Sequence, residues 1–131
     1  MSTSPGLTPF VEQYTVLLTS HKRDGTGVGT PVSIVVEGDH AYVRTYAKAW
    51  KARRMRNNPE IELAPCTLRG RPTGPTIKAR VRLLEHGSEE SKHAAKLLTR
   101  KYPFLHGALV PFAHKVKRDR TLHYEVRPLG G

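Results

Sequence analysis

The order of apolar and polar positions along the chain predicts mostly strands. Residues 14–46 hold three runs rich in β-branched and aromatic residues, "YTVLLTS", "PVSIVV" and "AYVRTY", separated by "RDGTG" and "EGDH". β-Branched and aromatic residues favour strands, and Asp-Gly between apolar runs is a strong hairpin signal. We therefore expect three strands joined by turns in this part of the chain.

Three later segments also predict strands. "EIELAPC" is the first, and its Pro65 indicates an edge or a bend because proline cannot donate to a sheet ladder. In "TIKARVRLLE" apolar and basic residues alternate, as in a half-buried strand, and the apolar face comprises Ile77, Ala79, Val81 and Leu83. "TLHYEVRPL" alternates in the same way at Leu122, Tyr124 and Val126.

Two segments have the composition of helices. Residues from about Trp50 to Asn58 are rich in Ala, Lys, Arg and Met, and Asn-Asn-Pro follows as a stop. The segment "GSEESKHAAKLLTRKYP" predicts a longer helix, with Ser88 as its N-cap, acidic residues in its first turn and basic residues near its end. Its apolar face is predicted to consist of Ala94, Leu97 and Leu98.

Successive strands joined by hairpins predict an antiparallel sheet rather than βαβ crossovers. We expect a mainly β chain with helices, of the α+β class, in which about six antiparallel strands form a small barrel and short helices close its ends. The 131 residues fit one domain, 1–131, with residues 1–8 as a loose lead-in and "PFVEQY" as one helical turn. Gly107 and Pro111 argue against regular structure in residues 104–120.

The charge balance points to anionic partners. The chain has 22 Lys and Arg against 11 Asp and Glu, a net charge of +11, and a pI of about 10.2. Such a balance attracts nucleic acid, acidic membrane surfaces or a small polyanionic ligand. The apolar runs are shorter than the roughly 20 residues of a membrane helix, and the start lacks a basic region followed by an apolar core. We expect a cytoplasmic protein with no membrane partner.

The shorter predicted helix concentrates this charge. Five cations fall within nine positions: Lys48, Lys51, Arg53, Arg54 and Arg56. At helical spacing Lys51 and Arg54 are neighbours, while Ala52 and Met55 share the face that docks on the barrel. The strand-to-helix junction after Thr45 places free backbone N–H groups beside Lys51, and this combination suits a phosphate. A solvated basic face is the alternative interpretation.

Other chemistries find little support in the sequence. "RDGTGVG" lacks the lysine and the strand–loop–helix setting of a P-loop, so it indicates a hairpin. The seven histidines are scattered, and Cys66 is the only cysteine, so neither a metal site nor a disulfide is expected. No nucleophile–base motif is present, and no catalytic residue is assigned. If the protein is an enzyme, a bound cofactor would carry the chemistry.

The string "DGTGVGTPVSIVVEGDHAYVRTYAKAWKARRMRNNPEIELAPCTLRGRPTGP" resembles a known family. It is similar to the flavin and deazaflavin oxidoreductases with the pyridoxamine 5'-phosphate oxidase-like, FMN-binding split β-barrel. The closer match is their actinobacterial branch, which uses the deazaflavin coenzyme F-420. The resemblance covers roughly residues 14–85 and, more loosely, the last strand.

The resemblance implies roles for particular residues. Thr45 and Lys51 match the positions that hold the cofactor phosphate, and Arg54 lies one turn further on. The family's flavin oxidases carry an Arg-Lys pair where this chain has Trp50-Lys51, which favours F-420 over FMN. Trp50 would then pack over the cofactor tail or over the entry to its site. The strand that lines the ring system is matched by Thr30, Pro31 and Val32.

The expected function follows from the same resemblance. It implies a homodimer with cofactor sites at the interface, in which hydride passes from reduced F-420 to an electron-poor conjugated small molecule. Residues 104–120 would cover the partner subunit's site. An FMN-dependent flavoprotein and a non-enzymatic cofactor-storage protein of the same fold are alternatives. A nucleic-acid-binding module is supported only by charge, and no specific nucleic acid is expected, because Trp50 is the only aromatic residue within the basic helix.

Overall fold

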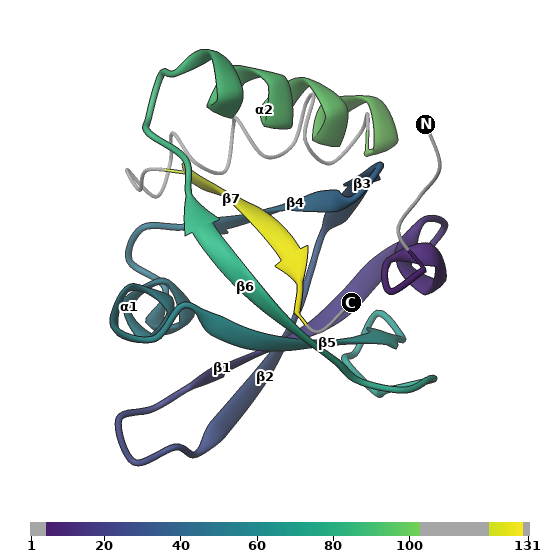
Figure 1. Cartoon of the computed structure of the whole chain (residues 1–131), viewed down its shortest axis with the longest axis vertical. Helices are drawn as coiled ribbons and strands as arrows, with labels where there is room; N and C mark the ends of the chain where they lie inside the picture. The colour runs from purple at the N-terminus through teal and green to yellow at the C-terminus, as the bar shows by residue number, and fades with distance from the viewer. Residues whose placement is uncertain (1–4, 103–120, 130–131) are drawn as a thin grey trace.

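One antiparallel sheet of seven strands dominates the computed structural model, which describes residues 5–102 and 121–129 (Figure 1). The segment 104–120, for which no regular structure was predicted, lies outside the described residues. The elements in chain order are η1 (Thr8–Phe10), β1 (Thr15–His21), β2 (Gly27–Val32), β3 (Ile34–Glu37), β4 (His40–Tyr46), α1 (Trp50–Asn57), β5 (Glu60–Cys66), β6 (Ile77–Leu83), α2 (Glu89–Lys101) and β7 (Thr121–Pro128).

The sheet curls because β2 and β3 follow each other in the chain but pair at opposite edges of the sheet. The strand order is β2-β1-β5-β6-β7-β4-β3, so β2 and β3 lie at opposite edges although only Ser33 separates them. Val32 pairs with Val16 of β1, and two residues later Ile34 pairs with Val43 of β4. This change of partner confirms the predicted antiparallel α+β split barrel. The run "PVSIVV", predicted as a single strand, is divided at Ser33.

The interior of the curled sheet is the main core. Alternate residues of each strand are buried there, together with Met55 of α1. Leu7, the N-cap of the short helical turn η1, and Phe10, its last residue, are fully buried in the same cluster. The loose lead-in predicted for residues 1–8 therefore does not extend to Leu7.

The two helices lie where the pattern placed them. In Figure 1, α2 lies across the top, above β4 and β7, and α1 lies at the left, where β5 begins. α1 also contacts β1. α2 begins at the predicted cap, since the Ser91 N–H donates to Ser88 Oγ at 3.1 Å. α1 ends at Asn57, one residue before the predicted end, and Asn58 is its C-cap.

The burial predicted for β6 from its alternating sequence is wrong at the last residue of the strand, Leu83. Leu83 was expected to share the buried face of Ala79 and Val81, but it is 53% exposed. The next residue, Leu84, is buried instead and packs with Tyr42 and other residues beneath α2. Alternation assigns a residue to one side of a strand, but it does not show where the neighbouring elements stop covering that side.

Candidate functional site

The junction between β4 and α1 has the predicted form. Thr45, next to the last residue of β4, is 6% exposed. The chain then turns, with the Ala49 N–H donating to the Tyr46 carbonyl at 3.0 Å, and α1 begins at Trp50. Ala49 is the N-cap, and its side chain offers no cap to the first turn. The helix therefore starts five residues after a buried hydroxyl residue, and no side chain caps its first turn.

Three hydroxyl residues face the barrel interior near this junction. Ser20 of β1 is fully buried, and Thr30 of β2 pairs with Leu18, which is buried on the same face as Ser20. Side chains directly opposite each other on antiparallel strands lie on one face. The Oγ1 atoms of Thr30 and Thr45 are buried and have no hydrogen-bond partner among the described residues. A buried hydroxyl without a partner costs about 1–3 kcal/mol, so both atoms suit an oxygen-rich ligand.

Two neighbouring cations of α1, Lys51 and Arg54, are partly buried, and one of them contacts a buried hydroxyl. The Arg54 Nε–H donates to Ser20 Oγ at 2.7 Å and so ties α1 to β1. Lys51 is half-buried, and no ion pair or hydrogen bond joins its side chain to any other described residue. Burial and the nearby charge of Arg54 lower the pKa of Lys51 below its usual value. An anion at this position would remove the cost of burying the ammonium group.

The remaining predicted residues are more dispersed. Val32 belongs to the core cluster, so only its backbone is available to a ligand, and Pro31 is exposed on β2. Trp50 is 69% exposed, and the guanidinium carbon of Arg53 lies 5.2 Å from its ring centroid. The structure thus places Lys51 and Arg54 close together on α1 and bonds Arg54 to Ser20, whereas Trp50 and Pro31 are exposed.

Ser20 is the site residue that the sequence analysis missed. It lies in "YTVLLTSH", where Val16 and Leu18 occupy the inward positions and Ser20 is the next inward one. A polar residue at an inward position of an alternating strand is a usable signal, because buried polar groups need partners. What the pattern does not show is that its partner is Arg54.

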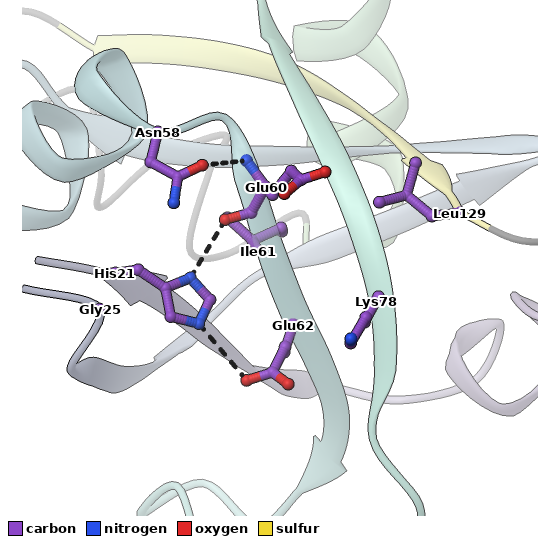
Figure 2. Close-up of a pocket in the computed structure, with 8 residues that line it drawn as sticks. All are labelled: His21, Gly25, Asn58, Glu60, Ile61, Glu62, Lys78 and Leu129. Atoms are coloured by element: carbon purple, nitrogen blue, oxygen red, sulfur yellow. Dashed lines mark hydrogen bonds and ion pairs between the residues drawn. The ribbon is translucent and has the colours of Figure 1, made fainter. Parts of the chain in front are cut away.

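A separate hollow of about 380 Å³ lies over β1, β5 and β6 (Figure 2). Glu62 points toward His21, whose Nε2 is 3.6 Å from Glu62 Oε1 and whose Nδ1 is 3.2 Å from the Glu60 carbonyl oxygen. The Glu60 carboxylate also lines this hollow. Its charged lining residues are Glu60, Glu62 and one lysine, Lys78, so it lacks the excess of cations found on α1 and is not the candidate site.

The described residues hold neither a cluster of metal ligands nor a membrane-spanning helix. Within residues 5–102 and 121–129, no group of three or more His, Cys, Asp and Glu side chains is placed to hold a metal ion. Cys66 is a free, buried thiol. No helix of the described chain is both long enough and apolar enough to cross a bilayer.

Comparison with known proteins gives matches at the level of structure. No family model matches the sequence, and no curated protein matches it. The haem storage protein HutZ from Vibrio cholerae is 16% identical with a TM-score of 0.73, and the match covers 100% of this chain and 93% of that one. An F420 reductase is 17% identical with a TM-score of 0.59, covering 98% of this chain and 97% of that one.

An FAD-binding protein from Mesorhizobium loti has the same architecture. It is 13% identical with a TM-score of 0.62, and the match covers 92% of this chain and 82% of that one. Identities this low show a shared fold and no more. The chain therefore has the split-barrel fold that these proteins use for different cofactors.

Proposed function

We propose that this protein is an F-420-dependent oxidoreductase, a cytoplasmic homodimer with cofactor sites at the subunit interface. Its reaction would pass a hydride from the reduced coenzyme to an electron-poor conjugated small molecule. The observation that carries the proposal is the β4–α1 junction. There, a buried hydroxyl without a partner, Thr45, precedes an uncapped helix start and an unpaired, half-buried ammonium group, Lys51, among the described residues.

A phosphate diester would satisfy each of these groups. Its oxygens accept hydrogen bonds from the Thr45 hydroxyl, the Lys51 ammonium group and the N–H groups that open α1. Arg54 donates its Nε–H to Ser20, which fixes the guanidinium and leaves its other nitrogens for the ligand. Thr30, on the same interior face, offers a second hydroxyl for the ring system.

The protein's part in the reaction is to bind the coenzyme and the substrate and to orient them toward each other. When bound, reduced F-420 supplies the hydride. Residues 41–59 contain no Asp, Glu or His, and no side chain of the junction is assigned as the acid. The proton that completes reduction of the substrate would then come from solvent. Placement of two reactants is sufficient for a large rate gain when their geometry is held.

Titration with F-420 and with FMN, followed by fluorescence, tests the proposal. We expect F-420 to bind more tightly than FMN, and Lys51→Ala to weaken F-420 binding by about 10- to 100-fold, the range for a hydrogen bond to a charged group. Lys92→Ala is the matched control, because Lys92 is exposed on α2, away from the junction. Equal and negligible binding of both cofactors would refute the proposal.

Two alternatives share the same binding site. Tighter binding of FMN would make the protein a flavoprotein, since FMN also carries a phosphate. A storage protein would bind F-420 but would not catalyse oxidation of the reduced coenzyme by a substrate. Steady-state oxidation of the reduced coenzyme over a panel of enones and quinones separates an enzyme from a storage protein.

A further inference from the structure

A second hollow, of about 330 Å³, lies on another face of α1. We call it the Trp50 pocket, and it is lined by Ala47, Lys48, Ala49, Trp50, Arg53 and Arg56. We propose that the Trp50 pocket binds a nucleobase linked to phosphate, either as a free nucleotide or as part of a single strand. This inference goes beyond the oxidoreductase function and does not depend on it.

The cations of this pocket are unneutralised. No carboxylate lines it, and none of Lys48, Arg53 and Arg56 takes part in an ion pair within the described chain. Two other exposed arginines are paired with carboxylates: Arg82 contacts Glu90 and Glu125, and Arg127 contacts Asp39 and Glu125. Three cations that line one hollow without a carboxylate attract a multivalent anion.

The pocket also offers an aromatic surface. Trp50 is the only tryptophan of the chain and is the most exposed of its large apolar side chains in the described residues, at 69%. The Arg53 guanidinium lies 5.2 Å from the ring centroid and holds one side of the indole in a cation–π contact. Arg56 follows three residues later on the same helix face. A planar base can stack on the indole while its phosphate reaches the cations.

A nucleobase linked to phosphate fits the Trp50 pocket better than an anion without a ring or the cofactor phosphate does. An anion without a ring would use the cations but leave the indole in water, whereas a nucleobase covers it. The cofactor phosphate proposed above needs Lys51 and Arg54, which do not line this pocket, and Arg54 is already bonded to Ser20. The sequence shows that Trp50 lies among cations. The structure adds that these residues line a hollow and that Arg53 lies over the indole ring.

The single tryptophan makes binding directly measurable. We would titrate the protein with AMP, with a hexathymidylate and with ribose 5-phosphate, while recording Trp50 fluorescence. AMP and the oligonucleotide should quench the emission, whereas ribose 5-phosphate, which has the same charge as AMP but no base, should bind at least tenfold more weakly. A more than tenfold preference for hexathymidylate over AMP would indicate a single strand. Ribose 5-phosphate binding as tightly as AMP would overturn the proposal.

Substitutions of the lining residues test whether the nucleotide binds in the Trp50 pocket. With a fluorescently labelled hexathymidylate, Trp50→Ala and Arg53→Ala should each weaken binding about tenfold, and Arg100→Ala, an exposed arginine of α2, should not. The slope of log K against log salt should be about −2 for three contacted phosphates, and Arg56→Ala should reduce it by about 0.7. Unchanged affinity of Trp50→Ala, with an unchanged far-ultraviolet spectrum, would refute the proposal. Lys51→Ala should impair F-420 binding alone, so the two proposals fail separately.

Discussion

Replacing Thr45 with valine should make the protein more stable and, at the same time, a poorer cofactor binder. The two side chains have nearly the same shape, so no cavity opens, and the buried hydroxyl without a described partner is removed. Such a hydroxyl costs about 1–3 kcal/mol. We therefore expect the free energy of unfolding to rise by about 1–2 kcal/mol, which at this chain length is roughly 3–8 °C in Tm.

Thermal unfolding of the ligand-free protein, followed by circular dichroism, measures the effect. Thr15→Val is the matched control, because the Thr15 hydroxyl donates to the Thr67 carbonyl at 3.1 Å. That substitution should lower stability by about 1 kcal/mol. A Tm of Thr45→Val at or below that of the unsubstituted protein would show that the Thr45 hydroxyl has a partner, and the reasoning about the junction would be wrong.

Three further predictions concern titration and buried hydrogen bonds. Burial lowers the pKa of His123 from 6.5 to about 4, and the charges of Arg44 and His86 contribute to the shift. As the pH falls, the unfolded chain therefore takes up a proton at this histidine before the folded protein does. Up to about 3 kcal/mol of stability should be lost as the pH falls from 6.5 to 4, and urea unfolding of His123→Gln should show a flatter profile. Burial lowers the pKa of Lys101 from 10.5 to about 8, so stability should rise between pH 8 and 10.5, and in Lys101→Met it should not. Tyr102→Phe should cost about 1–3 kcal/mol in the same assay, because the buried Tyr102 hydroxyl accepts from the Ile34 N–H at 3.2 Å and donates to the Tyr14 carbonyl at 2.6 Å.

Local patterns predicted most of the fold. β5 and the cap of α2 lie where the sequence placed them, because alternation, a stop signal and a capping serine are each properties of a few neighbouring residues. The division of "PVSIVV" at Ser33 was not predicted. It arises because the strand exchanges β1 for β4 as its partner, and partners distant in sequence leave no mark on a six-residue run.

The same limit applies to the candidate site. Thr45 and Lys51 could be proposed from the sequence because a strand end, a helix start and a run of positive charge are adjacent there. The bond between Ser20 and Arg54 joins residues 34 positions apart, and no spacing rule connects them. The hollow beside Trp50 depends on how α1 sits against its own entry turn, which composition does not specify.

A crystal structure of the protein with F-420 tests the central claim most directly. We expect a phosphate oxygen within about 2.7–3.2 Å of Thr45 Oγ1 and of Lys51 Nζ, at the first turn of α1. A coenzyme phosphate bound away from this junction, with both of these atoms still lacking a ligand contact, would contradict it.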